Sequence, residues 1–560
     1  MGHHVPHKFI KIRPSDKPWF TPYLRKKFQI CYRLHKRKNR TNRPADVQKY
    51  TEARRNAKTL FRQARKTYYE NLQSKIENPE TTSKTFWKLL KSLFSTSSTG
   101  IPTLNVNGTP ITENRAKAEA LNQFFASQST IEDPNSDLPP FNFVTDARLD
   151  HINIDDDEVK NILLSLDTNK ATGHDRISNK LLKECAESLC GPLTFIFRLS
   201  LRLGIFPDAW KEAIVSAIFK KLDPSLCKNY RPISLLSCIS KVFEKVVFNH
   251  TYPYLIENNL LPPHNSGFRQ NDSAINRIIA MLEGLYTGLD QHEDSLFISL
   301  DISKAFDRVW HRGLLFKLKQ LGITGILLEW FTSYLTGRCQ RVTLGGQKSS
   351  LKYINAGVPQ GSILGPILFL VYIFDMCNDL KSDPNQFADD TTITYKFENP
   401  INAVFDVNND LNKLTIWADR WKVLFAPSKT FYMRITNRKN QLPLPPLYLC
   451  GEPISETTQI KTLGVIITTD LSWNAHINNI IARASKRLTV MKRYRYCLPR
   501  KALETIYISM IRPILEYGDV LYDNCPLSTG RFLEQLQRQA ALVCTGGYRH
   551  TDYKNWETLK

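Results

Sequence analysis

The sequence of 560 residues predicts an α+β fold, for three reasons. After about residue 150, segments with apolar residues at helical spacing alternate with short runs rich in β-branched and aromatic residues. Past residue 472 the pattern is mostly helical. The hydrophobic share of 42% is that of a globular protein rather than a disordered one. Because the chain is too long for one ordinary core, we expect several subdomains.

The positive charge lies mainly at the amino-terminal end of the chain. Residues 1–100 contain 24 Lys and Arg against 6 Asp and Glu, and residues 481–560 contain 14 against 7. Residues 101–480 are nearly neutral, with 38 against 40. A neutral body with basic segments at both ends suits a polyanion that is held through phosphate contacts. A solvated basic tail has the same pattern, so charge alone leaves both interpretations open.

A basic amphipathic helix is predicted at residues 47–76. Its apolar residues recur at helical spacing: Tyr50, Ala53, Ala57, Leu60, Phe61, Ala64, Tyr68 and Leu72. Basic residues fill much of the remaining circumference: Arg54, Arg55, Lys58, Arg62, Arg65 and Lys66. The helix either binds phosphates through this basic face or packs its apolar stripe on a neighbour and leaves the rest in solvent. The sequence pattern fits both.

The rest of the chain divides at two predicted loops. Residues 92–100 are rich in Ser, Thr and Gly, and residues 133–140 are acidic and rich in Pro. Short strands are predicted at residues 213–219, 296–300 and 391–395. These runs carry the short β segments of the predicted α+β fold.

Cysteine usage and hydropathy indicate the compartment. Eleven cysteines are scattered without a Cys-x-x-Cys pair, which predicts a reducing compartment, no disulfide framework and no zinc knuckle. The residues after Met1 are polar and basic, so no signal peptide is expected. The longest apolar run, residues 363–374, contains Pro366 and is shorter than the ~20 residues that span a bilayer. We expect this run to be a buried core segment in a soluble protein without membrane contact.

Two segments place carboxylates at the ends of β-type runs. Asp301 follows the run at residues 296–300, and the pair Asp389-Asp390 lies between apolar and β-forming residues. In a hairpin the pair would sit at the tight turn and face Asp301 across the sheet. Phosphoryl transfer with two divalent cations needs carboxylates gathered in this way, since Mg²⁺ prefers oxygen ligands. Adjacent strand residues point to opposite faces, so Asp389 is expected to bind both metals and Asp390 to support it.

A third segment lies between these two. Residues 357–362 contain two glycines and a proline, which set an unusual backbone course and let a polymer approach closely. Gln360 within this segment can hydrogen-bond to what lies there. An Asp-Asp pair by itself most often marks a helix cap or an exposed turn, so the prediction depends on the three segments together.

In this order, the segments resemble the catalytic motifs of reverse transcriptases, most closely those of jockey-like non-LTR retrotransposons. Residues 301–310 resemble motif A, residues 356–366 motif B, and residues 387–390 motif C in a Phe-Ala-Asp-Asp form. Similar matches are residues 169–175, 229–235, 266–269, 426–430 (with Ala426 where Asn is usual), 462–465, 471–473 and 511–518. The resemblance covers roughly residues 150–550.

The resemblance implies a right-handed fingers–palm–thumb polymerase with an antiparallel palm sheet. The implied divisions are residues 1–98 as a basic helical extension, 99–149 as a linker, 150–295 as fingers and the start of the palm, 296–475 as palm with the catalytic motifs, and 476–560 as a helical thumb with a truncated carboxy-terminal region.

The resemblance also implies the catalytic roles. Two Mg²⁺ ions, which Mn²⁺ can replace, are expected at Asp301, Ile302, Asp389 and Asp390. Lys429 would protonate pyrophosphate as it leaves.

The nucleotide-binding roles follow from the same motifs. Arg231, with Lys220 or Lys221, would hold the triphosphate. Phe306 would be a steric gate that excludes a 2′-hydroxyl. The further residues expected to contact the nucleotide are Ser303, Lys304, Ala305 and Phe306 through a cradle of main-chain amides, together with Gln360 and Gly361.

The implied function is RNA-directed DNA synthesis by a non-LTR retrotransposon protein, with an RNA template, a DNA primer or target DNA, and deoxynucleoside triphosphates as partners. One alternative is a catalytically dead, RNA-binding retrotransposon fragment. The first 150 residues would not house the endonuclease that such elements usually carry, so a truncated element is expected. The other is an RNA-dependent RNA polymerase, with Asp307 as its sugar-reading carboxylate. The resemblance implies an intracellular protein, in the nucleus and the cytoplasm, as a ribonucleoprotein.

Overall fold

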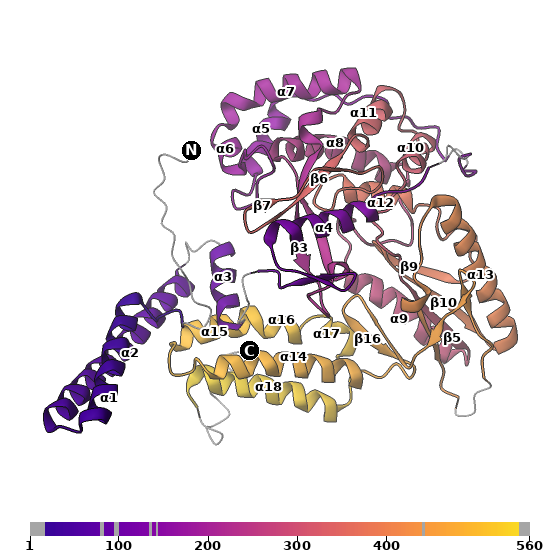
Figure 1. Cartoon of the computed structure of the whole chain (residues 1–560). Coiled ribbons are helices and arrows are strands. Elements are labelled where there is room, and N and C mark those ends of the chain that lie inside the picture. The colour runs from indigo at the N-terminus through magenta and orange to yellow at the C-terminus, as the bar shows by residue number, and fades with distance from the viewer. Residues whose placement is uncertain are drawn as a thin grey trace. The chain divides into compact units, whose positions relative to one another are not determined.

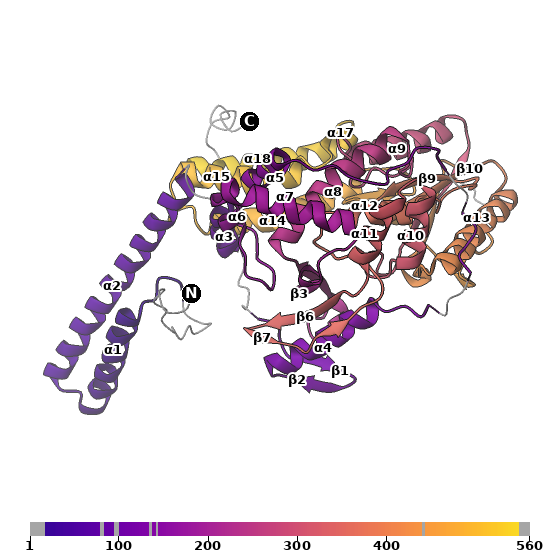
Figure 2. The same cartoon turned by 90° about the horizontal axis from the view of Figure 1, so that it is seen from above.

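The computed structural model describes residues 17–78, 83–94, 100–133, 137–141, 144–438 and 443–547. The chain forms two compact units, one of residues 1–99 with 474–560 and one of residues 100–473 (Figures 1 and 2). The mixture of helices and short, mostly antiparallel strands confirms the predicted α+β class.

The central sheet of the second unit has five strands. Their order is β14 (Ser455–Glu456), β11 (Phe431–Ile435), β5 (Asp294–Leu300), β10 (Asp390–Phe397) and β9 (Asp383–Phe387). The inner pairs are antiparallel, as expected, but β14 runs parallel to β11 at the edge. The strands predicted from the β-type runs are therefore confirmed as β5 and β10.

Helices cover this sheet. The helix α9 (Ala274–Asp290) packs against β5, β9 and β10, and α13 (Pro400–Trp421) packs against β10 (Figure 1). Every residue of β5 except Ser299 is buried. A strand that is buried on both faces has a nearly continuous run of apolar residues. For this reason the sequence of β5 does not alternate between apolar and polar residues.

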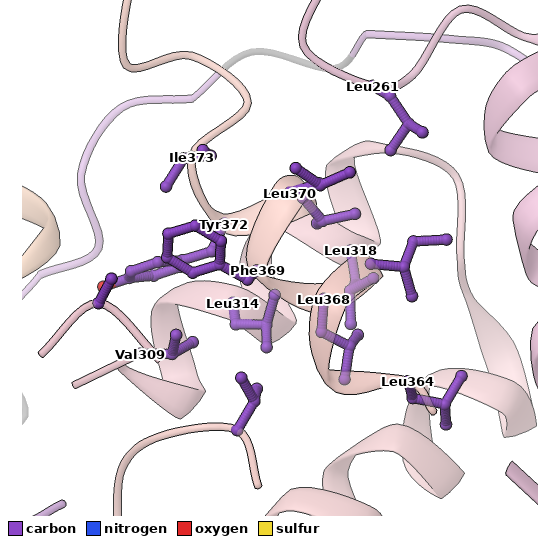
Figure 3. Close-up of a cluster of buried hydrophobic side chains, with 14 of the residues drawn as sticks. Leu261, Val309, Leu314, Leu318, Leu364, Leu368, Phe369, Leu370, Tyr372 and Ile373 are labelled. Atoms are coloured by element: carbon purple, nitrogen blue, oxygen red, sulfur yellow. The ribbon is translucent and has the colours of Figure 1, made fainter. Parts of the chain in front are cut away.

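The apolar run at residues 363–374 is confirmed as a core segment. It forms α12 (Gly365–Tyr372), all but one of whose residues are buried, with Pro366 in the first turn where no amide hydrogen bond is lost. Leu314 and Leu318 of α10 (His311–Gln320) contribute to the same cluster as Leu368 and Tyr372 (Figure 3).

A second sheet lies in the same unit. Its path is β4 (Tyr230–Leu235), β3 (Glu212–Phe219), β6 (Cys339–Leu344) and β7 (Gln347–Lys348), and β8 (Lys352–Tyr353) also pairs with β6. The strands β3 and β4 are antiparallel, whereas β3 and β6 are parallel. The predicted strand at residues 213–219 is thus confirmed as β3.

The interpretation of residues 99–149 as a linker needs correction. They contain a hairpin, β1 (Leu104–Val106) with β2 (Thr109–Ile111), and the helix α4 (Asn114–Gln128). Leu121 and Phe125 of α4 are buried in a core shared with β3, β4 and β6. The sequence did not predict this helix, because its apolar residues pack on β3, β4 and β6, which come much later in the chain.

The remaining elements of the second unit are α5 (Asp156–Ser165), α6 (Asn179–Glu184), α7 (Ala186–Leu203), α8 (Cys238–Glu257), α11 (Gly325–Leu335), three 3₁₀ turns (Asp208–Trp210, Cys227–Asn229 and Pro427–Lys429), and the hairpins β12 (Tyr448–Leu449) with β13 (Glu452–Pro453) and β15 (Gln459–Thr462) with β16 (Val465–Thr468).

The first unit is helical and combines the two ends of the described chain. Its elements are α1 (Pro22–Thr41), α2 (Pro44–Glu77), α3 (Ser83–Phe94), α14 (Asn474–Lys492), α15 (Arg500–Met510), α16 (Arg512–Leu515), α17 (Asp519–Tyr522) and α18 (Leu527–Thr545). The predicted helix at residues 47–76 is confirmed as α2, and the helical pattern past residue 472 is confirmed as well. The helices α1 and α2 lie side by side (Figures 1 and 2).

The apolar stripe of α2 is covered within this unit. Leu72 and Ile76 are buried, α2 packs against α15, and the ring of Tyr69 lies 6.1 Å from the ring of Tyr494. Nearer its start, Phe61 contacts Phe28 of α1, with 6.2 Å between ring centroids. The stripe is therefore a packing surface, while the basic residues of α2 remain exposed.

The described residues include only part of each predicted loop. Residues 92–94 end α3, and residues 95–99 lie outside the described part of the chain. Residues 133 and 137–140 are in neither helix nor strand, and residues 134–136 are again outside it. All eleven cysteines are unpaired. Among the described residues, no helix combines the length and the apolar character needed to cross a membrane.

Candidate active site

Strand pairing brings the three predicted carboxylates to one end of the central sheet. Thr391 of β10 pairs with Leu300 of β5, so Asp390 and Asp301 are the next residues in the antiparallel register. Phe387 pairs with Asp390, which leaves Ala388 and Asp389 as a two-residue turn between β9 and β10. The predicted hairpin is confirmed; Asp389 lies in its turn, whereas Asp390 is the first residue of β10 and is next to Asp301 in the register.

The turn is held by a buried side chain that the sequence analysis did not single out. The side-chain amide of Asn265 hydrogen-bonds to both backbone groups of Ala388. Its Oδ1 accepts from the Ala388 N–H at 3.0 Å, and its Nδ2 donates to the Ala388 carbonyl at 3.2 Å. Ala388 has a φ of +58°, a conformation that costs energy for a residue with a Cβ. A Cβ on Gly267 would lie 2.2 Å from the Ala388 nitrogen, so only glycine fits there. The motif at residues 266–269 was the only signal for this contact.

The charges of the aspartates interact. Burial by the surrounding protein raises the pKa of Asp389 and of Asp390, although both side chains reach solvent. The negative charge of Asp301 raises both pKa values further, whereas the positive charge of Arg231 lowers them. Carboxylates that repel one another are a suitable donor set for a divalent cation, whose charge offsets the repulsion.

As the side chains stand, no group of three or more His, Cys, Asp or Glu side chains within the described ranges is gathered closely enough to hold a metal ion. One Asp301 oxygen is instead paired with the ammonium of Lys429, at 3.1 Å. Ile302 is buried and has an apolar side chain, so only its main-chain oxygen could act as a ligand. The fit to a metal therefore rests on the chemistry of the donors.

A cluster of positive charge faces the carboxylates. Burial is the main cause that lowers the pKa of Lys220, and the nearby positive charges lower it further: Arg231, Lys304 and Lys429. Such crowding of cations suits a polyphosphate, which would offset their repulsion. Of the two lysines that the sequence left open, both follow the end of β3 and are exposed, and Lys220 is the one that interacts with this cluster.

The predicted gate is packed between two rings. Phe306 is half-buried and stacks on Phe369, with 4.7 Å between centroids, and meets the edge of Phe268 at 6.0 Å. The Phe306 carbonyl accepts from the Val358 N–H at 2.8 Å, which ties the gate to the segment containing Gln360. Phe306 is thus both a core contact and a residue at the edge of the site.

The glycine-rich segment lies against the second sheet. The Ser234 N–H of β4 donates to the Gln360 carbonyl at 2.8 Å. Gly361 has a φ of +126°, and a Cβ there would lie 2.6 Å from the Ser234 carbonyl oxygen. Another backbone does come close to this glycine. It belongs to β4, the strand that also carries Arg231, and not to a bound polymer.

A second buried side chain supports this segment from behind. Glu244 of α8 is fully buried and accepts from the N–H groups of Ile363 and Leu364, at 2.7 and 3.3 Å. These amides precede α12 and would otherwise be unpaired at its amino-terminal end. Nothing in the sequence near Glu244 pointed to this role, because the partner lies over 100 residues away.

The predicted amide cradle needs one correction. The Ser303 N–H donates to the Leu424 carbonyl at 2.7 Å and is not available to a phosphate. Within the described part of the chain, the N–H groups of Lys304, Ala305 and Phe306 have no hydrogen-bond partner, so these three remain candidates. Lys304 has a φ of +54°, which turns the chain sharply at this point.

A buried histidine hydrogen-bonds to the glycine-rich segment at residues 357–362. His311 is 6% exposed, and its Nε2–H donates to the Gly357 carbonyl at 2.7 Å. Burial foremost, with the positive charge of Arg338 adding to it, lowers the pKa of His311 to about 4, so the ring is neutral at pH 7.

This histidine predicts a pH dependence of stability. Its pKa is 6.5 in the unfolded chain and about 4 in the folded one, so between these values the unfolded chain binds more protons. We expect the free energy of unfolding to fall as pH drops from 6.5 toward 4, by at most about 3 kcal/mol from this group. Denaturant midpoints at pH 7.5 and 5 would measure the effect. His311→Gln keeps a neutral donor and should remove this part of the pH dependence; an unchanged dependence would contradict the assignment.

Comparison with known proteins points to one family. Residues 218–467 match the family described as "Reverse transcriptase (RNA-dependent DNA polymerase)". This range contains the three carboxylates, the basic cluster, the gate and Gln360.

Individual relatives agree with the family match. The chain is 33% identical over 400 residues to "Probable RNA-directed DNA polymerase from transposon X-element" of Drosophila melanogaster, which covers 70% of this chain and 44% of the relative. It is 31% identical over 380 residues to "RNA-directed DNA polymerase from mobile element jockey" of the same organism, covering 65% and 41%. It is 27% identical over 537 residues to the corresponding protein of transposon BS, covering 92% and 58%. The chain spans about half the length of these curated relatives.

Proposed function

The chain belongs to the reverse transcriptase family, and we propose that it extends a primer on an RNA template by adding deoxynucleotides. The observation that carries the proposal is the meeting of Asp301, Asp389 and Asp390 at one sheet end, opposite a cluster of cations. Carboxylates can hold divalent cations, and the positive cluster can hold the triphosphate. The two halves of a phosphoryl-transfer site are therefore adjacent.

The metal ions in this proposal are Mg²⁺, which Mn²⁺ can replace. Asp301, Asp389 and Asp390 would hold them, with the main-chain oxygen of Ile302 as a further donor. When bound, two such ions stabilise the attacking and the leaving oxygen of a nucleotidyl transfer. Lys429 now pairs with Asp301, so its ammonium is already at the site and can give a proton to the leaving pyrophosphate.

The protein's own residues position the nucleotide. Arg231 and Lys220 hold the triphosphate, and the free amides of Lys304, Ala305 and Phe306 add neutral donors beside it. The ring of Phe306 excludes a 2′-hydroxyl. Its stacking on Phe369 and the hydrogen bond to Val358 prevent it from moving aside.

We assign polymerase subdomains on the same basis. The central sheet corresponds to a palm, the sheet of β3 and β4 to part of the fingers, and α14 to α18 to a thumb. Because α2 packs on α15, the basic extension belongs structurally with that thumb.

The alternative of an RNA-dependent RNA polymerase is less favoured by the geometry. It would use Asp307 to read a ribose hydroxyl. Asp307 is only 8% exposed, and its Oδ1 already accepts a hydrogen bond from Gln360 at 2.8 Å. The alternative of a dead RNA-binding fragment is countered by the site, which retains all three carboxylates and the cations opposite them.

Primer extension tests the proposal directly. Purified protein with an RNA template, a DNA primer and Mg²⁺ should extend the primer with deoxynucleotides and far less with ribonucleotides. Preferential use of ribonucleotides would favour the RNA polymerase alternative. Template binding without extension, in either Mg²⁺ or Mn²⁺, would favour the non-catalytic one.

We also propose that α2 contacts RNA through its exposed basic face. Its positively charged residues are solvent-exposed even though the apolar stripe is covered: Arg54, Arg55, Lys58, Arg62, Arg65 and Lys66. The two interpretations of this helix are therefore compatible, because they concern different faces of it. An intracellular ribonucleoprotein, found in nucleus and cytoplasm, would be the form in which this surface is used.

Charge reversal on α2 should weaken template binding in a salt-dependent way. The variant changes four basic residues of α2 to Glu: Arg54, Arg55, Arg62 and Lys66. The slope of log affinity for RNA against log salt concentration should become less negative by up to about three, since each phosphate contact contributes about −0.7 for a single strand. The extension rate on saturating template should change little. Titrations at several salt concentrations measure the slope.

The matched control is Leu72→Ala, which removes buried apolar contact from the same helix without changing its charge. It should lower the free energy of unfolding by about 2–5 kcal/mol, and with it the unfolding midpoint, but leave the salt dependence of RNA binding unchanged. An unchanged slope in the charge-reversed variant would show that the basic face is only solvated.

A further inference from the structure

Gln360 has a side-chain partner that can set which end of its amide faces the site. Its Nε2 donates to Asp307 Oδ1 at 2.8 Å, across 53 positions of sequence. An ionised carboxylate only accepts hydrogen bonds, so it can bind the NH₂ end of an amide and not the oxygen end. The Oε1 of Gln360 makes no hydrogen bond to the protein within the described ranges.

Asp307 interacts with the Gln360 amide and with neighbouring cations. Burial is the largest influence and raises the pKa of Asp307, while the hydrogen bond from Gln360 and the positive charges of Lys304 and Lys220 oppose that rise. These two lysines also belong to the cluster assigned to the triphosphate. Asp307 is therefore close to both the cations and the Gln360 amide.

The backbone around this pair is also tied together. The N–H groups of Gly357 and Val358 donate to the carbonyls of Val309 and Phe306, both at 2.8 Å. A Cβ on Gly357 would lie 2.6 Å from the Asp307 carbonyl oxygen, and the φ of Gly357 is +87°. The segments carrying Asp307 and Gln360 are thus held at a short, defined separation.

We infer that Asp307 is a positioning residue for nucleotide selection: its carboxylate holds the Gln360 amide with the NH₂ end inward, so that Oε1 is presented to a hydroxyl or amino donor on the incoming nucleotide. The inference rests on the proposed function and deepens it. Without Asp307 the amide can turn over and present its donor end, which repels such a group on the substrate. Asp307 acts through Gln360 and does not itself touch the nucleotide.

The test uses Asp307→Asn, which keeps the shape of the side chain but can bind either end of the Gln360 amide. Steady-state primer extension should show KM for a deoxynucleotide raised about ten-fold, the equivalent of one lost hydrogen bond, with kcat changed less than about three-fold. Gln360→Ala should raise KM similarly. In the double variant the effects should not multiply, because the first residue acts through the second.

The control is Asp410→Asn, at another buried carboxylate in the same unit. Asp410 accepts from the N–H groups of Lys381 and Ser382, which are not part of the site. This change should lower the unfolding midpoint without altering KM. Thermal unfolding of every variant shows whether a KM change accompanies a loss of fold, and Asp307→Ser provides a second, smaller side chain if Asp307→Asn is poorly folded.

Three results would overturn the inference or the proposal beneath it. An unchanged KM in both folded Asp307 variants would show that Asp307 does not position the substrate. Effects that multiply with Gln360→Ala would show that Asp307 acts by charge on Lys304 and Lys220 instead. A wild-type protein that does not extend primers would refute the proposed function, which is a distinguishable outcome.

Discussion

Asp301→Asn and Asp389→Asn are each expected to lower the rate of primer extension by about three orders of magnitude or more. Each change removes a negative oxygen donor from the sheet end where β5 meets the β9–β10 turn, but it removes no basic contact to nucleic acid. The affinity for template should therefore stay within about two-fold of the wild type. Single-nucleotide addition and template binding, measured on the same preparations, would separate the two effects.

A suitable control is Asp419→Asn, an exposed carboxylate on α13 outside the site. It should leave both the rate and the affinity unchanged. Wild-type activity in Asp301→Asn across a magnesium titration would refute the assignment of the metals to these carboxylates.

Phe306→Ala is expected to relax sugar discrimination. Because the ring's bulk would no longer meet a 2′-hydroxyl, the ratio of kcat/KM for a deoxynucleotide to that for the matching ribonucleotide should fall by about ten- to two-hundred-fold. The change also removes the stacking on Phe369, so some loss of stability should accompany it, less than the about 3–5 kcal/mol of a fully buried ring because Phe306 is half-buried.

Phe331→Ala is the matched control for that loss. Phe331 is a fully buried ring of α11 in the same core, and its truncation should cost at least as much stability without changing the sugar ratio. If Phe306→Ala is folded and the ratio does not move, the ring serves only as core packing.

Much of the local structure could be predicted from the sequence. The strands β3, β5 and β10 follow from short β-rich runs, α2 follows from apolar periodicity, and α12 follows from an apolar run that is too short for a membrane. The helix α4 was not predicted, because the strands that bury its apolar residues, β3, β4 and β6, come much later in the chain. The parallel pairing of β14 with β11 could not be predicted either, since strand order depends on contacts distant in sequence.

The candidate site divides in the same way. The motif spacing identified Asp301, Asp389 and Asp390, and pairing places all three together; their catalytic roles are predictions that the experiments above test. The occupied amide of Ser303 and the pairing of Lys429 with Asp301 came only from the structure. Both are contacts between segments more than 100 residues apart.

The sequence by itself determined the order of the catalytic segments, through which it resembles reverse transcriptases, and the residue types that carry charge, because these depend on the spacing of residues along one chain. Only the tertiary structure decided how those segments are supported: Asn265 around Ala388, Glu244 at the start of α12 and Asp307 on Gln360. Each supporting contact joins a buried polar side chain to a partner on another element. A buried polar group must be hydrogen-bonded, but which distant group satisfies it depends on how the chain packs, and that is not encoded in any local pattern.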